Sequence, residues 1–253
     1  MPDVRFIAHR GSSATRPEHT RAAYVQALRD GADGIETDVR LTADGEVVCW
    51  HDATVDRTSN GRGRVRELSL SQLRGLDVLR GHLLPDGFGR PDEQLVTLRE
   101  LIDIVEPAGR ALLLVVELKA DRGAEQRLVD ATLDILDAAT PRLPDLDVSL
   151  MSFSRVSADA VLSRDRQVML LAQDGQDTSF RAIDRGPYGA GPDIEWVRRF
   201  PDTVHRWVRE GRDVRVWTVD TLADLMLCVE LGVREITTNR PAELRAEYRS
   251  ALA

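Results

Sequence analysis

The chain has 253 residues, of which 42% are hydrophobic, and its formal net charge at pH 7 is −8. That length suits a single α/β barrel of about 250 residues, and the acidic balance argues against nucleic acid or an anionic lipid surface as a partner. No apolar stretch approaches the roughly 18 residues that span a bilayer. Since the first core strand is expected at 5–9, no room remains for a leader, and we expect a cytoplasmic protein. Cys49 and Cys228 match no metal or redox spacing.

Short apolar runs alternate with helical patterns along the whole chain, which is typical of a parallel sheet covered by helices. Strands are expected at 5–9, 34–38, 46–51, 112–118, 147–152, 168–172, 188–194, 214–218 and 234–238. Helices are expected at 19–30, 97–106, 124–139, 155–163, 196–210 and 220–231, with Glu18 and Asp220 near two of their starts. The pattern predicts one distorted (β/α)8 TIM-type barrel over residues 1–253.

The second and third strands are an exception to this alternation. Only Thr42-Ala43-Asp44-Gly45 separates them, whereas a parallel crossover needs a dozen or more residues. Asp-Gly is a hairpin signal, so the two strands should be antiparallel and should bring His51 beside Glu36 and Asp38. Residues 53–96 then interrupt the barrel pattern, and we interpret them as a small cap insertion with little regular structure.

Reactive side chains stand where four of the predicted strands end, at His9-Arg10, Glu36-Thr37-Asp38, His51-Asp52 and Glu117-Leu118-Lys119. In a βα-barrel the functional groups lie at the carboxyl ends of the strands. Burying so many charges there is costly unless they pair or hold a metal. Glu36, Asp38 and Glu117 offer three hard oxygen ligands, which suit Ca²⁺ or Mg²⁺ better than zinc.

His9 and His51 are candidates for acid–base catalysis, because phosphodiester cleavage needs a base for the nucleophile and an acid for the leaving alkoxide. Arg10 and Lys119 are the natural phosphate contacts. Lys119 is the only lysine among 34 basic residues. Trp217 could form an apolar wall against the alcohol portion of a substrate. The remaining histidines, at positions 19, 82 and 205, receive no catalytic role.

At these positions the chain resembles the glycerophosphodiester phosphodiesterase family. The matching segments run in the family's order and include His9-Arg10-Gly11, Arg16-Pro17-Glu18-His19-Thr20, Gly34-Ile35-Glu36-Thr37-Asp38-Val39, His51-Asp52, Asp56-Arg57-Thr58, Glu117-Leu118-Lys119, Trp217-Thr218-Val219 and Thr238-Asn239-Arg240-Pro241. The resemblance implies a distorted barrel with an insertion after His51. It also implies hydrolysis of small glycerophosphodiesters to glycerol 3-phosphate and an alcohol. From the acidic charge we expect no stable membrane association.

By position, the resemblance makes His9 and His51 the acid–base pair, without deciding which is the acid in the first step. It makes Glu36, Asp38 and Glu117 ligands of a divalent cation. In the mechanism proposed for such enzymes, the metal polarises the phosphate, the substrate's neighbouring hydroxyl attacks first, and water opens the cyclic intermediate. The head group, the choice between Ca²⁺ and Mg²⁺ and the oligomeric state stay open.

The chain departs from the family pattern at three positions. His19 stands where asparagine is common, Asp220 follows Trp-Thr-Val where asparagine is usual, and Asn239 replaces the aspartate of Thr-Asp-x-Pro. Because the last two changes exchange an amide and a carboxylate near neighbouring strand ends, we hypothesise that they compensate each other.

Two other functions remain as alternatives. One is a related barrel phospholipase that acts on intact phospholipids, although the chain shows no basic or aromatic-rich amphipathic segment, and only 5% of its residues are aromatic. The other is a phosphodiester- or metal-binding protein without catalysis, which would not require both histidines.

Overall fold

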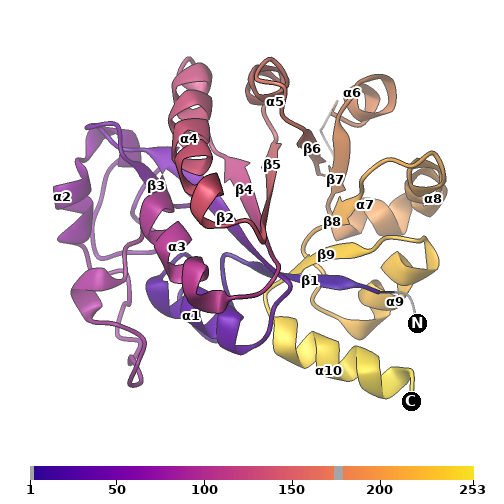
Figure 1. Cartoon of the computed structure of the whole chain (residues 1–253), viewed down its shortest axis with the longest axis horizontal. Helices are drawn as coiled ribbons and strands as arrows, with labels where there is room; N and C mark the ends of the chain where they lie inside the picture. The colour runs from indigo at the N-terminus through magenta and orange to yellow at the C-terminus, as the bar shows by residue number, and fades with distance from the viewer. Residues whose placement is uncertain (1–2, 174–178) are drawn as a thin grey trace.

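The computed structural model describes residues 3–173 and 179–253 and shows strands at the centre with helices around them (Figure 1). The strands are β1 (Arg5–His9), β2 (Gly34–Leu41), β3 (Val47–Cys49), β4 (Leu112–Leu118), β5 (Leu146–Ser152), β6 (Val168–Ala172), β7 (Gly189–Pro192), β8 (Arg215–Val216) and β9 (Glu235–Thr238).

Eight of these strands form a parallel barrel. Their order is β7-β6-β5-β4-β2-β1-β9-β8, and β3 pairs only with β2, outside this path. Two isolated bridges, Ala190 to Val214 and Asp193 to Trp217, join the β7 and β8 ends of the sheet and bring it close to closure. The predicted (β/α)8 barrel is confirmed.

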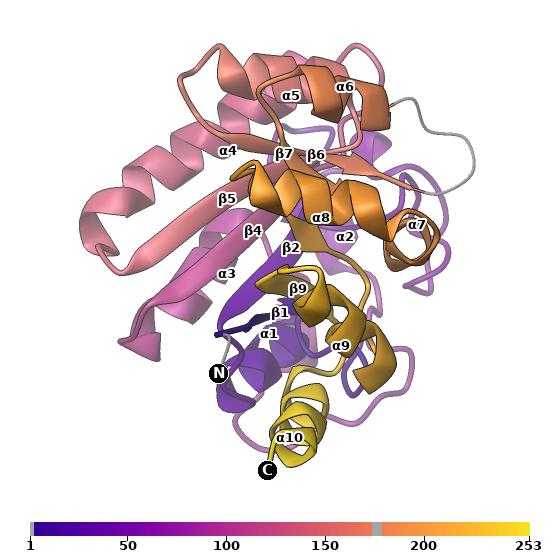
Figure 2. The same cartoon turned by 90° about the vertical axis from the view of Figure 1, so that its right-hand side faces the viewer.

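The α-helices lie around the strands, as with α5 beside β5 and β6 (Figure 2). They are α1 (Arg21–Arg29), α2 (Leu70–Arg74), α3 (Leu98–Val105), α4 (Glu125–Ala139), α5 (Arg155–Leu162), α6 (Ser179–Arg185), α7 (Ile194–Arg199), α8 (Pro201–Arg209), α9 (Leu222–Glu230) and α10 (Pro241–Ala251). None of the helices in the two described ranges is both long and apolar enough to cross a bilayer.

The prediction of a single helix at 196–210 is wrong. The chain leaves the helical conformation at Phe200, with φ −131° and ψ 54°, and divides the segment into α7 and α8. Pro201 causes the break, because it disfavours a helical conformation of the preceding residue and has no N–H to donate. The sequence pattern also missed α2, α6 and α10.

The predicted hairpin between the second and third strands is confirmed. β2 and β3 are antiparallel, with Val39 opposite Cys49. The pairing continues one residue further, where the Trp50 N–H donates to the Asp38 carbonyl at 2.9 Å. His51, the next residue, therefore leaves the hairpin beside Asp38.

The barrel has two apolar regions. Side chains from β1, β4, β5 and β6 fill its interior, and a larger cluster lies between the strands and the helices. Because strand side chains alternate between faces, the interior rows that pass through Ile7 and Leu113 end at His9 and Glu117. Gly34 starts the corresponding row of β2, where a Cβ atom would lie 2.6 Å from the Leu113 carbonyl oxygen.

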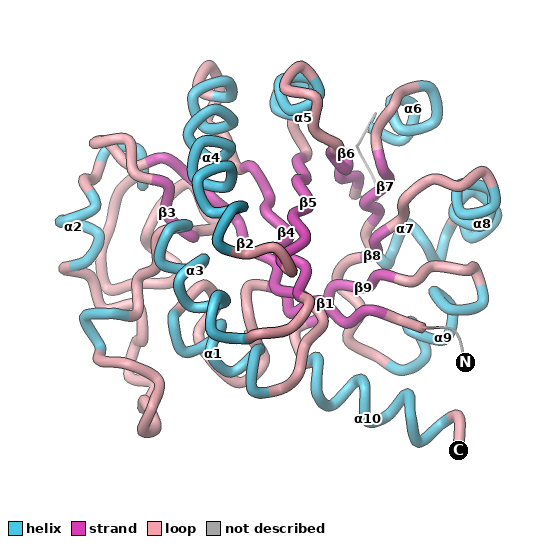
Figure 3. The backbone as a smooth tube through the Cα atoms, in the orientation of Figure 1, coloured by secondary structure: helices cyan, strands magenta, loops and turns pink. Residues whose placement is uncertain are grey.

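Residues 53–96 are mostly loop (Figure 3). They contain α2 and 3₁₀ turns at 65–67 and 91–93. A small apolar cluster around Trp50 and Leu73 joins them to β3. We propose that this segment is a cap within a single barrel domain.

Candidate active site

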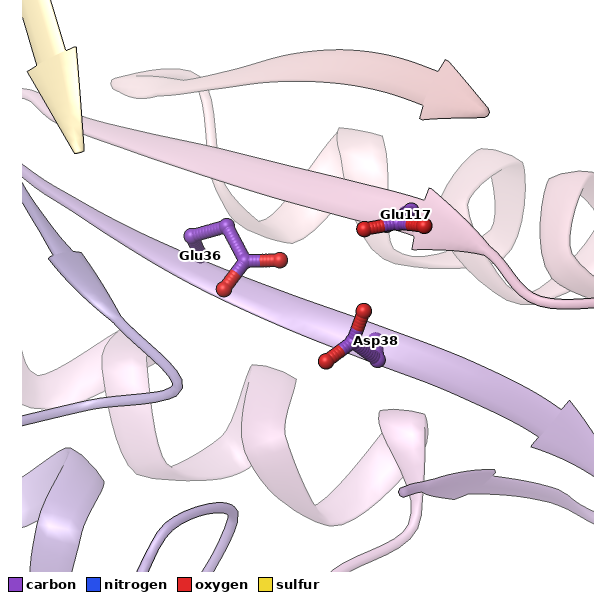
Figure 4. A group of neighbouring side chains, drawn as sticks. All are labelled: Glu36, Asp38 and Glu117. Carbon is purple, nitrogen blue, oxygen red and sulfur yellow. The ribbon is translucent and has the colours of Figure 1, made fainter. Parts of the chain in front are cut away.

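Three carboxylates meet near the carboxyl ends of β2 and β4. Glu36 and Asp38 project from one face of β2, and Asp38 is paired in register with Glu117 of β4. All three are buried, and one oxygen of each lies within 4.8 Å of the other two (Figure 4). Oxygen ligands at this spacing fit a divalent cation. The Asp38 Oδ1 atom is buried and accepts no hydrogen bond from the described residues, which leaves a ligand atom aimed into the group.

Burial controls protonation of these carboxylates. It raises the pKa of Glu36 well above its usual range, and the charge of Asp38 adds to this effect. Burial and Asp38 also raise the pKa of Glu117 to about 8. For Asp38 itself burial acts in the same direction, but Lys119 and His19 outweigh it and hold the pKa well below its usual range. Near neutral pH a cation would therefore have to displace protons from the two glutamates.

The two predicted phosphate contacts lie against these carboxylates. Lys119 Nζ is 2.6 Å from Glu117 Oε1 and 3.4 Å from Asp38 Oδ1. Arg10 Nε is 3.1 Å from Asp38 Oδ2, and its Nη1 donates to Glu18 at 3.0 Å. The structure thus places both cations at the carboxylate group, where their partners are carboxylates.

The loop after β1 positions Arg10 by backbone geometry. Arg10 has a φ of 57°, and its N–H donates to the carbonyl and to the side chain of Glu36, both at 3.0 Å. The next residue, Gly11, has a φ of 81°, and a Cβ atom there would lie 2.6 Å from the backbone of Ala23. Only glycine therefore lets this loop lie against α1.

His9 is hydrogen-bonded to a neutral side chain, and a nearby carboxylate sets the orientation of that side chain. Asn239 Nδ2 donates to Asp220 Oδ2 at 2.5 Å, so its Oδ1 atom faces His9 Nδ1 at 2.8 Å. An amide oxygen only accepts, which means that His9 carries its proton on Nδ1 and presents the lone pair of Nε2. Burial and the neighbouring Arg10 lower the pKa of His9 to about 4.

His51 has a charged partner instead. Its Nδ1 atom is 2.6 Å from Asp52 Oδ1, and Asp52 in turn accepts from Arg57 Nε at 2.6 Å. Arg57 also donates twice to Glu18, at 2.7 and 2.8 Å, which links the insertion to the Arg10 loop. Burial lowers the pKa of His51, and the carboxylates of Asp38 and Asp52 oppose this effect.

Trp217 faces the same interior space as His9. A cavity of about 30 Å³ is lined by both residues together with Glu36, Glu117 and Lys119. The indole N–H donates to the Gly191 carbonyl at 2.9 Å, and the ring packs edge-on against Phe153. The exposed part of the indole is therefore apolar, and its role as a wall against a substrate stays a prediction.

Sequence reasoning missed two residues of the site. His19 is buried beside Asp38, with Nε2 at 2.9 Å from Oδ2. Arg40 donates to the carbonyls of His51 at 2.8 Å and Lys119 at 3.0 Å, and so ties together the ends of β3 and β4. The departure from asparagine at position 19 was the one available signal for the histidine.

The expectation for the two helix starts is wrong in detail. Thr20 caps α1 and Thr221 caps α9, each by accepting a backbone N–H. Glu18 and Asp220, the carboxylates that we expected there, instead bind Arg10 and Asn239.

The raised pKa of Glu117 predicts how stability changes with pH in the absence of metal. Its pKa is about 8 in the folded chain against an ordinary 4.5, so between these values the folded state binds more protons than the unfolded state, and its stability falls as pH rises. Glu117→Gln removes this titration. In chelator we expect the variant to exceed the wild type in unfolding free energy by more than about 1 kcal/mol at pH 8.5, and by much less at pH 5.

Urea unfolding at both pH values measures this difference, and Glu230→Gln at the exposed end of α9 controls for the loss of one negative charge. A Glu117→Gln variant no more stable than the wild type at pH 8.5 would contradict the account of the buried carboxylates.

Most of this chain is similar in sequence to known proteins. Residues 9–243 match the model of the glycerophosphoryl diester phosphodiesterase family. A probable glycerophosphodiester phosphodiesterase 1 of Mycobacterium tuberculosis is 39% identical over 95% of this chain and 90% of its own length. A glycerophosphodiester phosphodiesterase of Caldanaerobacter subterraneus is 32% identical over 94% and 95%, respectively.

Solved structures agree with the fold. A phosphodiesterase of Oleispira antarctica, in complex with the product sn-glycerol-3-phosphate, superposes with a TM-score of 0.80 at 23% identity and covers 96% of this chain and 95% of its own. A putative glycerophosphoryl diester phosphodiesterase from Silicibacter pomeroyi gives 0.82 at 24%, over 99% and 94%. With the family model and the relatives above, the chain belongs to the glycerophosphoryl diester phosphodiesterase family of hydrolases.

Proposed function

We propose that the protein hydrolyses small glycerophosphodiesters to glycerol 3-phosphate and an alcohol, by acid–base catalysis between His9 and His51 beside a divalent cation. The observation that carries the proposal is the buried group of Glu36, Asp38 and Glu117. The two glutamates line one cavity with His9, and Asp38 lies beside the strand end that leads to His51.

Glu36, Asp38 and Glu117 are the residues that would hold the cation, as Ca²⁺ or Mg²⁺. The chemistry that such an ion supplies is neutralisation of the negative phosphate oxygens as the fifth bond to phosphorus forms. Arg10 and Lys119 add two positive charges at the same place, which a net acidic chain needs in order to attract an anionic substrate.

His9 is suited to act as the base. Its Nε2 atom carries a lone pair, and its low pKa keeps it neutral at physiological pH. In the first step it removes the proton from the substrate hydroxyl next to the phosphate, whose oxygen then bonds to phosphorus.

His51 is suited to act as the acid. The Asp52 carboxylate stabilises its imidazolium form, so the ring can deliver a proton to the departing alkoxide as the phosphorus–oxygen bond breaks. In the second step neutral His51 takes a proton from water, whose oxygen attacks phosphorus. Protonated His9 then returns its proton to the glycerol oxygen that leaves the cyclic phosphate, which regenerates both histidines.

An assay with purified full-length chain tests the proposal. We expect release of glycerol 3-phosphate from at least one of several glycerophosphodiesters when Ca²⁺ or Mg²⁺ is present, and loss of that release in chelator. His51→Ala should reduce kcat on the order of 10²–10⁴-fold, the usual range for a general acid or base.

His205→Ala, on the exposed face of α8, is the matched control for histidine removal. Absence of glycerol 3-phosphate from every substrate with metal supplied would contradict the proposed reaction, and a loss below tenfold in His51→Ala would remove His51 from it.

The amide and carboxylate at positions 239 and 220 should compensate each other, because they contact directly. With Asp220→Asn the new amide would face the Nδ2 donor of Asn239, and turning Asn239 to avoid this would present a donor to His9 Nδ1. Asn239→Asp would place two carboxylates in contact. We expect each single change to lower kcat/KM at least tenfold and the double exchange to recover part of the loss, because it again places an acceptor opposite His9, here a charged one.

Steady-state kinetics of the four proteins measure this coupling. If the loss in the double variant equals the product of the two single losses, the two positions do not compensate each other.

A further inference from the structure

His19 is the most deeply enclosed histidine next to the carboxylate group, and the proposed reaction gives it no part. Its side chain is 5% exposed. Nε2 is 2.9 Å from Asp38 Oδ2 and Nδ1 is 2.9 Å from the Tyr24 hydroxyl. Both ring nitrogens are therefore occupied by protein, so the ring is placed to orient its neighbours.

The direction of these hydrogen bonds follows from their donors and acceptors. An ionised carboxylate only accepts, so His19 donates through Nε2 to Asp38. In the neutral ring Nδ1 then accepts from the Tyr24 hydroxyl, whose oxygen accepts in turn from Thr37 Oγ1 at 2.8 Å. The chain from Thr37 through Tyr24 thus holds His19 in the tautomer that donates to Asp38.

The two oxygens of Asp38 have different partners. Oδ2 receives the His19 Nε2–H and lies 3.1 Å from Arg10 Nε. Oδ1 accepts no hydrogen bond from the described residues and turns to the interior, 3.4 Å from Lys119 Nζ. The hydrogen bond from His19 and the ion pair with Arg10 restrict rotation of the carboxylate and leave the other oxygen aimed at Glu117.

The backbone supports the same arrangement. His19 and Arg10 both have a positive φ, 59° and 57°, and the His19 N–H donates to the Arg10 carbonyl at 3.1 Å. Left-handed conformations of residues other than glycine cost of order 1–3 kcal/mol each and persist where the surroundings enforce them. Here they bring the His19 ring and the Arg10 guanidinium from one loop to the same carboxylate oxygen.

We propose that His19 is a positioning residue for the cation site: by occupying Asp38 Oδ2 together with Arg10, it presents Oδ1 as the metal ligand. This inference depends on the cation site of the proposed function but not on the proposed acid–base steps. Groups that orient metal ligands typically contribute 10–100-fold to metal affinity.

Direct calorimetric titration of the full-length chain with Ca²⁺ and with Mg²⁺ tests this role. His19→Leu removes the donor, and we expect the Kd for the cation that the wild type binds to rise about 10–100-fold. In His19→Gln the side-chain amide reaches the position of Nε2 and still donates, so its Kd should stay within about threefold of the wild type, well below the loss in His19→Leu. Tyr24→Phe frees the ring to change tautomer and should weaken binding by a smaller, measurable factor.

His205→Leu is the matched control and should bind as the wild type does, and thermal melting in chelator shows which variants are folded. A folded His19→Leu with wild-type affinity, or His19→Gln as weak as His19→Leu, would overturn the proposal. If His19→Leu does not fold, Tyr24→Phe decides the matter, because wild-type affinity there would contradict the hydrogen-bond chain.

The readout separates this inference from the reaction itself. A wild-type chain that binds the cation but releases no glycerol 3-phosphate would contradict the proposed reaction and leave the role of His19 standing. A wild-type chain that binds neither cation would overturn the site and the role of His19 together.

Discussion

Three carboxylates buried within 4.8 Å of one another are the constraint on which the rest of the site depends. Such a group is unfavourable in an apolar interior unless opposite charge or protons reduce its repulsion. In this chain Arg10 and Lys119 provide two positive charges, and burial keeps protons on the glutamates. A divalent cation would satisfy the same need with a better match to three oxygen ligands.

The two histidines differ because their partners differ. His9 faces an amide oxygen, whereas His51 faces a carboxylate that an arginine from the insertion also binds. A neutral partner favours an unprotonated ring, and a charged one favours the imidazolium. In the proposed reaction, the division between base and acid would therefore depend on residues 239 and 52, outside the two imidazoles, and the insertion would contribute to it through Arg57.

Local sequence patterns were enough to predict most of the barrel and its reactive strand ends. Apolar runs that stop at His9, Asp38 and Glu117 indicate buried strands, and parallel topology then brings their ends together. The roles of His19 and Asp220 were not predictable in this way. Their partners lie on other elements, Asp38 on β2 and Asn239 after β9, and hydrogen bonds between distant segments leave no periodic signal. The prediction of one helix across Phe200 failed for a different reason. The apolar pattern there suits a single helix, but the proline that follows Phe200 breaks it.

The most direct test of the buried carboxylate group as a cation site is the anomalous diffraction of crystals grown with Ca²⁺. For a cation site here, we expect one strong peak bonded to an oxygen of each of Glu36, Asp38 and Glu117 at about 2.3–2.6 Å, with Oδ1 as the Asp38 ligand. The absence of a peak there at saturating Ca²⁺, or a peak bound by other residues, would contradict it.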